Sequence, residues 1–373
     1  MKLELFDYDL PGELIAQFPA GQRDASRLLV AHRRTGKTED RNFSDLPEYL
    51  REGDVLVLND SRVIKARLMG EKIPTGGRVE LFLLRRLSDE VLSDIRDSKQ
   101  IIPGESPNET NLWECLAKPG KRLKKGDRIV FGKDQGMELV ATVIGKSGDG
   151  SVTAMFDQRG DEFDKALEKV GHTPLPPYIR RADDAGDAER YQTVYAREPG
   201  SAAAPTAGLH FTPELLENIR GNGVETAFVT LHVGLGTFQP VKEAEIEDHP
   251  MHEEFYHISE EAARTINRAK DEGRRIVCVG TTSVRTLEGA SVRGHEGNRH
   301  VRPGWGSTDI FLYPGGRKFF MTDALVTNFH LPKSTLLMLV SAFYDREKVL
   351  EIYRDAVRKH YRFFSYGDAM LIL

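Results

Sequence analysis

The chain has 373 residues, of which 39% are hydrophobic, and its formal net charge is −5 at pH 7. This length allows about two domains of ordinary size, and the composition favours a globular multidomain enzyme. The negative charge argues against a surface coated in nucleic acid, although a local basic patch can still dock one RNA loop.

The sequence predicts neither a signal peptide nor a membrane span. Residues 1–17 carry four acidic side chains and no continuous apolar stretch. The longest apolar run, Leu336–Val340, falls far short of the roughly 20 residues that a membrane helix needs. We therefore expect a cytoplasmic protein, and we expect a monomer because no coiled-coil pattern or obvious interface stripe is present.

The two cysteines, Cys115 and Cys278, lie far apart, each within an apolar segment. Neither has a second Cys or a His nearby at the spacing of a zinc site. We expect buried free thiols and no bound metal.

In chain order, the first clear pattern is a series of short strands between Val63 and Phe156, separated by glycine-bearing turns. Their spacing predicts a small β-barrel. The expected strands are Val63–Leu68, Arg78–Leu84, Leu112–Ala117, Arg128–Phe131, Glu138–Ile144 and Ser151–Phe156. Between two of them, the polar segment Ser88–Asn111 predicts an exposed or disordered loop.

Outside this block, strands alternate with helices, which is typical of an α/β domain. Thr212 is the expected N-cap of a helix that ends near Gly221, before the strand Glu225–Val233. Ser259 caps a second helix, and the strand Arg275–Val279 follows it. Two further helices are expected to begin after Ser334 and Asp345.

The order of these patterns predicts an insertion. Helix-and-strand patterning occurs both before Val63 and after about Asp157, on either side of the barrel. We therefore predict one discontinuous α/β domain, formed by residues 1–62 and 157–373, with an inserted β-barrel domain formed by residues 63–156.

Ligands of α/β domains bind at the carboxyl ends of strands and at helix N-termini. The strand Val55–Leu58 is followed there by Asn59, Asp60, Ser61 and Arg62, which offer donors, acceptors and a carboxylate. Ordinary turn chemistry explains such a cluster about equally well.

Two further segments with histidines lie at similar positions. The small residues of Gly200–His210 allow close approach to a nucleoside-sized ligand, although a tightly packed connection is the commoner explanation. His232 comes at the end of the strand Glu225–Val233, before Gly234, Gly236 and Thr237. These glycines lack the pattern of a dinucleotide-binding loop.

The remaining polar segments follow later strands. Gly280–Ser283 follows a strand, and Arg285 can assist anion binding at that helix N-terminus. The alternative is a Thr or Ser cap with a surface ion pair between Arg285 and Glu288. His330 and Lys333 precede an apolar helix, where a lone histidine is more often structural than catalytic.

Several long motifs together resemble one known family. They include GSAAAPTAGLHFT at Gly200–Thr212, HVGLGTF at His232–Phe238, TNFHLPKSTLLMLVSAF at Thr327–Phe343, LVLNDSRVIKAR at Leu56–Arg67 and GTTSVRTLE at Gly280–Glu288. The resemblance is to the S-adenosylmethionine:tRNA ribosyltransferase-isomerases, and it covers nearly the whole chain. The long Ser88–Asn111 segment departs from it, because the family usually has a shorter connection there.

The resemblance implies a discontinuous α/β domain with an inserted barrel, in agreement with the patterns above. It also implies that S-adenosylmethionine is consumed as a ribosyl donor, with no separate cofactor. The implied acceptor is 7-aminomethyl-7-deazaguanine at the wobble position of the tRNA anticodon stem-loop. The implied products are epoxyqueuosine in tRNA, adenine and methionine.

This chemistry needs a base that acts near neutral pH, because the sulfonium makes the C5′ hydrogens of the donor acidic. Histidine meets this need with an unperturbed pKa of about 6.5. We hypothesise that His210 and His232 are the acid and base, with His330 and Asp60 as second candidates.

The donor must also be held in place. Thr281, Thr282 and Arg285 are the candidate partners of its methionine carboxylate. The other candidate donor-binding residues are Asn59, Ser61, Arg62, Thr206, Gly208, Thr237 and Lys333.

Basic residues of the predicted barrel and of the segment after it are candidates for tRNA binding. They are Lys121, Arg122, Lys124, Lys125, Arg180 and Arg181. Phosphate contacts of this kind position an anticodon stem-loop and make binding salt-dependent. A solvated hairpin face is the alternative.

Two other functions compete with this hypothesis. An S-adenosylmethionine-dependent RNA methyltransferase would form S-adenosylhomocysteine and release no adenine. A noncatalytic tRNA-binding adaptor would bind tRNA and leave the donor unconsumed.

Overall fold

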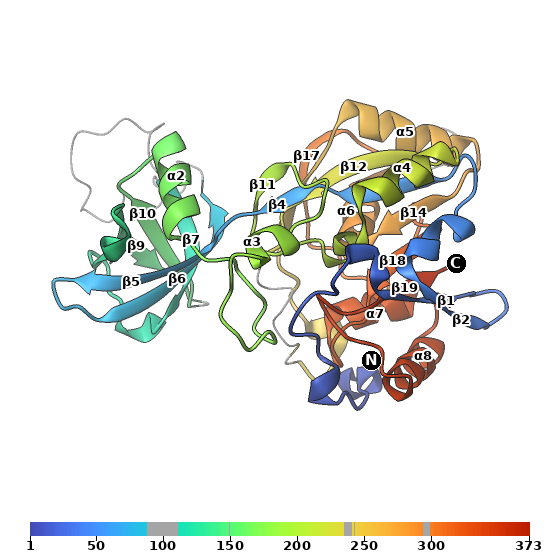
Figure 1. The fold of residues 1–373 in the computed structure, drawn as a ribbon, viewed down its shortest axis with the longest axis horizontal. Helices are drawn as coiled ribbons and strands as arrows, with labels where there is room; N and C mark the ends of the chain where they lie inside the picture. Colours follow the sequence, from blue (N-terminus) through green and yellow to red (C-terminus); the bar gives the residue numbers. More distant parts are fainter. Residues whose placement is uncertain (88–110, 149, 235–240, 242, 294–298) are drawn as a thin grey trace. The chain divides into compact units, whose positions relative to one another are not determined.

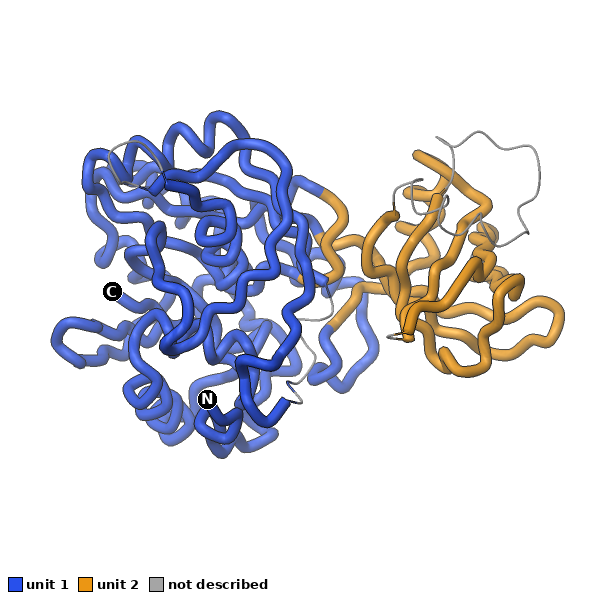
Figure 2. The backbone as a smooth tube through the Cα atoms, turned by 180° about the vertical axis from the view of Figure 1, so that it is seen from behind, with its two compact units in different colours: residues 1–62, 176–198, 204–373 blue, residues 63–175, 199–203 orange. Residues whose placement is uncertain are grey.

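The computed structural model describes residues 1–87, 111–148, 150–234, 241, 243–293 and 299–373. The chain divides into two compact units (Figure 2). The main unit comprises Met1–Arg62, Pro176–Glu198 and Ala204–Leu373, and the barrel unit comprises Val63–Leu175 and Pro199–Ala203. The predicted fold class, an α/β unit with a β-barrel inserted in its sequence, is confirmed.

The main unit is built on a 9-stranded sheet (Figure 1). Its central strands β12, β3, β14 and β18 run parallel, and the remaining neighbours are antiparallel except for the parallel pair β19 and β1. The strand order is β17 (Gly304–Thr308), β13 (Glu254–Ile258), β12 (Glu225–Leu231), β3 (Val55–Asn59), β14 (Ile276–Val279), β18 (Ala324–Asn328), β19 (Ala369–Ile372), β1 (Arg27–Ala31) and β2 (Thr38–Asn42).

The central strands are buried on both faces, which explains their continuous apolar sequences. On β3, Val55 and Val57 belong to one core cluster, whereas Leu56 and Leu58 belong to the other. This alternation follows from the two-residue period of a strand. The first cluster is covered by α5 (Glu260–Asp271), α6 (Gly280–Ala290), α7 (Thr335–Phe343) and α8 (Arg346–Arg358), and the second by α4 (Pro213–Gly221) and the 3-10 segment η4 (Phe43–Tyr49).

The predicted helix starts are confirmed. The side chains of Thr212, Ser259, Ser334 and Asp345 each accept a hydrogen bond from a backbone N–H in the first turn of α4, α5, α7 and α8 respectively. Each bond satisfies one of the donors that a helix start leaves without a partner. The short helix α3 (Asp187–Arg190) has no side-chain cap of this kind.

The barrel unit contains a closed barrel of six strands, which removes exposed sheet edges. The order is β10 (Val152–Phe156), β7 (Asn111–Lys118), β6 (Arg78–Arg86), β5 (Arg67–Ile73), β8 (Arg128–Phe131) and β9 (Leu139–Lys146). Short strands β4 (Ser61–Val63) and β11 (Glu198–Ser201) lie where the chain passes from one unit to the other, and β15 (Ser291–Arg293) pairs with β16 (Arg299–Val301) in the main unit.

The insertion ends later than the sequence indicated. Residues up to Leu175 belong to the barrel unit, whereas the predicted boundary was Phe156. The reason is helix α2 (Gly160–Val170), whose Phe163 packs on the barrel residues Trp113 and Phe156 with ring centroids 5.8 and 5.0 Å apart. Helical patterning alone did not distinguish a helix of the α/β unit from one that covers a barrel.

One strand prediction was misplaced. The expected strand Val63–Leu68 is replaced by β5, whose sequence RLMGEKI mixes apolar and polar residues and exposes Met69, Glu71 and Ile73. Lys72 of β5 pairs with Asp127 at 2.7 Å. The predicted loop Ser88–Asn111 lies outside the described residues apart from Asn111, which begins β7.

Two other expectations can be compared with the structure. Cys115 and Cys278 are buried free thiols, as predicted. None of the helices that the structure describes combines the length and apolar character that a membrane span needs.

The N-cap of α4 gives a test of the fold. Thr212 Oγ1 accepts from the backbone N–H of Leu215 at 3.1 Å. We expect Thr212→Ala to lower the free energy of unfolding of the main unit by about 1 kcal/mol, because this donor loses its partner. Urea denaturation followed by circular dichroism measures the change. Thr212→Ser keeps the hydroxyl and serves as the control; equal destabilisation by both variants would contradict the capping role.

Candidate active site

Four parallel strands bring their carboxyl ends to the same edge of the main sheet. β3 ends at Asn59 and Asp60, β12 is followed by His232, β14 by Gly280, and β18 ends at Asn328. Because β12, β3, β14 and β18 are adjacent in this order, segments far apart in sequence meet there (Figure 1). The predicted clustering of polar residues at strand ends therefore holds for these segments.

Asn59 is a structural residue of this edge. Its side chain is fully buried and makes three hydrogen bonds: Oδ1 accepts from the backbone N–H of Leu231 at 3.1 Å and of Ser61 at 3.0 Å, and Nδ2 donates to the Leu231 carbonyl at 3.1 Å. These bonds join β3 to β12. Both acceptor positions of Oδ1 and one N–H of Nδ2 are thus used within the protein, which weighs against the predicted donor-binding role of Asn59.

Asp60 lies beside this link with its carboxylate held from two sides. Thr230 Oγ1 donates to Oδ1 at 2.7 Å, and the guanidinium of Arg197 donates to Oδ2 at 2.9 Å. Only 5% of Asp60 is exposed, so the pairing fixes the carboxylate in position. Ser61 is buried with a hydroxyl that has no partner among the described residues, and Arg62 is exposed.

His232 is positioned by strand pairing and by an aromatic neighbour. Its backbone N–H donates to the Phe255 carbonyl at 3.0 Å, and its ring stacks on Trp305 with 6.4 Å between centroids. Burial lowers the pKa of His232 below 6.5, while the carboxylates of Glu198 and Asp60 oppose this shift. Its Nδ1 has no hydrogen-bond partner among the described residues. His232 is therefore mainly neutral at pH 7 and able to accept a proton.

In contrast to His232, both ring nitrogens of His210 have hydrogen-bond partners. Its Nδ1 lies 2.7 Å from Ser26 Oγ, and its Nε2 lies 3.1 Å from Asn328 Nδ2. Asn328 Nδ2 also donates to the Phe364 carbonyl, so this atom is the amide nitrogen and His210 Nε2 is the acceptor. Burial lowers the pKa of His210 to about 3, with a further contribution from Arg362 and Arg23. His210 is thus a neutral, fully hydrogen-bonded side chain.

His330 is similarly enclosed. Its Nε2 lies 2.8 Å from Thr327 Oγ1, its carbonyl accepts from the Tyr8 hydroxyl at 2.5 Å, and its N–H donates to the Tyr353 hydroxyl at 3.2 Å. Burial lowers the pKa of His330 to about 3. These contacts favour a structural role for His330 and leave its catalytic role a prediction.

The small-residue segment packs against the start of α6. The 3-10 segment η8 (Thr206–His210) follows it, and a Cβ added to Gly280 would lie 3.7 Å from Cβ of Ala207. Gly208 faces Tyr195 and Thr193 so closely that a Cβ there would clash with both side chains. The small residues at Ala207 and Gly208 are thus explained by packing, whereas Thr206 is half-buried.

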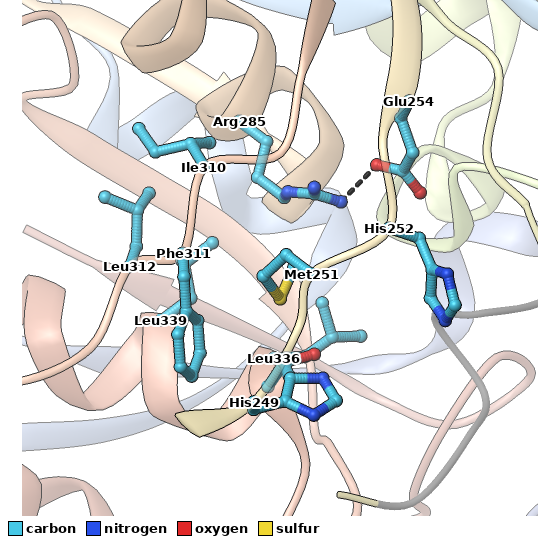
Figure 3. A pocket seen from close by; sticks show the side chains of 11 residues that line it. His249, Met251, His252, Glu254, Arg285, Ile310, Phe311, Leu312, Leu336 and Leu339 are labelled. Carbon is cyan, nitrogen blue, oxygen red and sulfur yellow. Dashed lines mark hydrogen bonds and ion pairs between the residues drawn. The ribbon is translucent and has the colours of Figure 1, made fainter. Parts of the chain in front are cut away.

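Helix α6 places Arg285 in a pocket of the main unit (Figure 3). The side chain is 8% exposed, and Nη1 donates to Glu254, which begins β13. Nε and Nη2 of Arg285 have no hydrogen-bond partner among the described residues. Thr281 and Thr282, which the sequence grouped with Arg285, are not among the residues that line this pocket.

The alternative expected for α6, a Thr or Ser cap with an Arg285–Glu288 ion pair, is wrong. Val279 is the N-cap and provides no side-chain bond. Glu288 is fully buried and accepts from the backbone N–H groups of Phe320, Met321 and Thr322 at 2.9 to 3.1 Å, so its carboxylate anchors that segment.

Comparison with known sequences supplies the family. A profile described as "Queuosine biosynthesis protein" matches residues 3–372. The chain belongs to this family. The S-adenosylmethionine:tRNA ribosyltransferase-isomerase of Symbiobacterium thermophilum is 54% identical over 373 residues, and that of Caldanaerobacter subterraneus subsp. tengcongensis is 52% identical over 373 residues; both alignments cover 100% of each chain.

A solved structure agrees with this assignment. The crystal structure of the S-adenosylmethionine tRNA ribosyltransferase from Thermotoga maritima has 40% sequence identity and a TM-score of 0.52 to this chain. The match covers 99% of this chain and 100% of that chain. The queuosine biosynthesis family and its mixed α/β fold with a barrel are thus supported along nearly the full length.

Several residues predicted to bind ligands in this family member are engaged elsewhere. Lys333 pairs with Asp7 at 2.9 Å. Arg181 makes two bonds to the carboxylate of Asp187 at 2.5 and 2.7 Å, which leaves its neighbour Arg180 as the exposed one of the two. Thr237 lies outside the described residues.

The predicted tRNA-binding residues of the barrel unit form one basic stretch around the 3-10 segment η6 (Gly120–Arg122), before β8. The side chains of Lys121, Arg122, Lys124 and Lys125 are all exposed. Exposure is compatible with phosphate binding and equally with a solvated hairpin face, so their role stays a prediction.

Sequence reasoning missed the partners of the site residues. Glu254, Arg197, Thr230 and Asn328 were not singled out, although Asn328 lies inside the TNFHLPK motif. The polar residues of the segment His249–His257 offered a signal for Glu254. Among the described residues, no group of three or more His, Cys, Asp or Glu side chains is arranged to hold a metal ion.

The buried state of His210 predicts a pH dependence of stability. Its pKa is about 3 in the folded protein against 6.5 without burial, so the unfolded chain binds the proton more readily. Stability from this residue is present above pH 6.5 and is lost as the pH falls towards 3. His210→Asn keeps a donor to Ser26 and removes the titration.

We expect the unfolding free energies of the wild type and the His210→Asn variant to approach each other by about 1 kcal/mol between pH 8 and pH 5.5. Urea denaturation at both pH values measures the two differences, and the pH 8 value controls for lost packing. A constant difference would show that His210 does not titrate as its burial implies.

Proposed function

We propose that this chain transfers and isomerises the ribosyl moiety of S-adenosylmethionine onto 7-aminomethyl-7-deazaguanine at the wobble position of tRNA. The products are epoxyqueuosine-tRNA, adenine and methionine. The observation that carries this proposal is the match along 100% of the chain, at 54% and 52% identity, to proteins named S-adenosylmethionine:tRNA ribosyltransferase-isomerase. The same names give no support to the methyltransferase alternative.

His232 is the side chain best placed to take the first proton. Its lowered pKa keeps the ring neutral near pH 7, and Nδ1 has no partner among the described residues. The sulfonium of the donor acidifies the neighbouring C5′ hydrogens, so a neutral imidazole is a sufficient base. The resulting ylide opens the ribose and expels adenine, after which the substrate amine attacks and methionine leaves.

Asp60 supports this role by charge. Burial lowers the pKa of His232, and the carboxylates of Glu198 and, to a smaller extent, Asp60 oppose this shift, which stabilises the imidazolium once the proton has moved. Arg197 and Thr230 hold the Asp60 carboxylate in the position from which it acts. Asp60 is thus assigned as a positioning and electrostatic residue, and His232 as the catalytic base.

The remaining parts of the proposal concern partners and setting. The basic residues Lys121, Arg122, Lys124 and Lys125 are candidate contacts to the phosphates of the anticodon stem-loop. The target base must leave its stack to be modified. We assign the reaction to the cytoplasm, with the enzyme acting as a monomer and S-adenosylmethionine consumed as a substrate.

Isotope transfer tests the function directly. The protein is incubated with precursor tRNA and S-adenosylmethionine labelled with carbon-14 in the ribose. We expect the label in tRNA and equimolar free adenine in solution, both measured by chromatography. A tRNA without ribose label, or accumulation of S-adenosylhomocysteine, refutes the proposed reaction.

The role of His232 is tested by His232→Gln. We expect adenine release to fall by about 10²- to 10⁴-fold with little change in tRNA binding, because the variant lacks a base of suitable pKa. His257→Gln is the matched control, since His257 also packs on Trp305, at 4.7 Å between centroids, from the neighbouring strand. A His232→Gln enzyme as active as the control would remove His232 from the mechanism.

A further inference from the structure

Arg285 has an unusual state for a buried arginine. Its side chain is 8% exposed, and of its three guanidinium nitrogens only Nη1 has a hydrogen-bond partner among the described residues, Glu254. Nε and Nη2 are buried without a hydrogen-bond partner among the described residues. Buried donors are rarely left unsatisfied, because removing them from water without replacement is costly. The arrangement points to a ligand group that completes these bonds.

The geometry of the unpaired atoms defines what this group is. The N–H groups of Nε and Nη2 lie on one edge of the planar guanidinium and point in parallel. A carboxylate accepts such a pair through its two oxygens. Glu254 occupies the other side of the guanidinium, so a second carboxylate at the free edge would complete the shell of Arg285.

The rest of the pocket is largely apolar (Figure 3). Met251 and Phe311 line the pocket together with Arg285, as do Leu336 and Leu339 of α7. Sulfur packs favourably against aromatic rings, and a sulfonium gains further from their negative faces. A short sulfur-containing chain therefore suits this lining better than a polar one.

We propose that this pocket binds the methionyl end of the sulfonium donor and retains free L-methionine as the product. Arg285 takes the α-carboxylate on the edge formed by Nε and Nη2, and the negative charge of Glu254 attracts the α-ammonium. Met251, Phe311, Leu336 and Leu339 surround the side chain that carries sulfur. This assignment rests on the proposed function for the identity of the donor, and it adds Glu254 and the apolar lining to the recognition site.

A series of small ligands tests the pocket on the unmodified protein, by isothermal titration calorimetry without tRNA. L-Methionine carries both charged groups, 3-(methylthio)propylamine lacks the carboxylate, and 4-(methylthio)butanoate lacks the ammonium. We expect saturable binding of L-methionine and at least about tenfold weaker binding of the amine. Absence of saturable L-methionine binding overturns the proposal. Equal affinity for L-methionine and 3-(methylthio)propylamine overturns it too.

Variants assign the recognition to the two charged residues. Arg285→Lys keeps the charge beside Glu254 but loses the paired N–H groups, so methionine binding should weaken about tenfold while binding of 3-(methylthio)propylamine stays unchanged. Glu254→Gln should weaken the binding of L-methionine and leave the binding of 4-(methylthio)butanoate unchanged, because this ligand has no ammonium group. Unchanged methionine affinity in Arg285→Lys contradicts the assignment.

Arg275→Lys is the matched control. Arg275 forms a comparable pair with the buried carboxylate of Asp54, through Nε at 3.0 Å and Nη2 at 2.5 Å. Both residues precede strands, β14 and β3, and therefore lie at the amino ends of the sheet, away from the site. This variant should bind methionine as the wild type does; equal weakening in both Arg→Lys variants would indicate a general loss of structure and overturn the specific role of Arg285.

The two proposals fail differently. If the protein transfers ribose to tRNA but its methionine binding does not depend on Arg285, the assignment of this pocket is wrong and the proposed function stands. If the protein discriminates the three ligands but transfers no ribose, the pocket is an amino-acid site and the proposed transferase function is wrong.

Discussion

The side chain of Asn59 ties β3 to β12 through bonds to both backbone groups of Leu231, and the rest of the candidate site depends on this link. It fixes where the two parallel strands end, and so where the next residues begin. Asp60 is then directed to Thr230 and Arg197, and His232 follows Leu231 directly. A buried amide that makes three hydrogen bonds to the backbone is well suited to this task, because it tolerates little displacement.

The three histidines of the motifs differ in their hydrogen bonds. His210 and His330 are both buried, and their side chains contact polar groups that keep them neutral. Burial lowers the pKa to about 3 in both, and Arg362 and Arg23 lower that of His210 further. His232 is less enclosed and has two carboxylates within electrostatic range. The contacts of His210 and His330 thus favour a structural role, whereas Nδ1 of His232 has no partner among the described residues and can accept a proton.

Much of the fold could be predicted because its signals are local. Thr212, Ser259, Ser334 and Asp345 cap helices through bonds that span three residues, and the double-sided burial of β3 is visible as the run Val55–Leu58. The misplaced details depend on distant partners. Nothing near Arg285 in sequence indicates that it pairs with Glu254, 31 residues away, while Glu288 binds backbone groups. The packing of Phe163 on Trp113 likewise joins a helix to a strand that no short window contains.

Charge is distributed at the carboxyl edge in a way that matches a sulfonium nucleoside. Asp60 and Glu254 are both nearly buried, and each is joined to an arginine, so the edge carries two anion–cation pairs with little net charge. The two pairs differ in the exposure and the hydrogen bonding of their arginines. The side chain of Arg197 is 59% exposed, whereas Arg285 keeps a buried edge without partners among the described residues. A donor with a zwitterion at one end and a cationic sulfur next to the reacting carbon needs both kinds of pair. In the proposed reaction, the Arg285–Glu254 pair supplies hydrogen bonds to the methionyl end of the donor, and the Arg197–Asp60 pair supplies negative charge near His232, the proposed base.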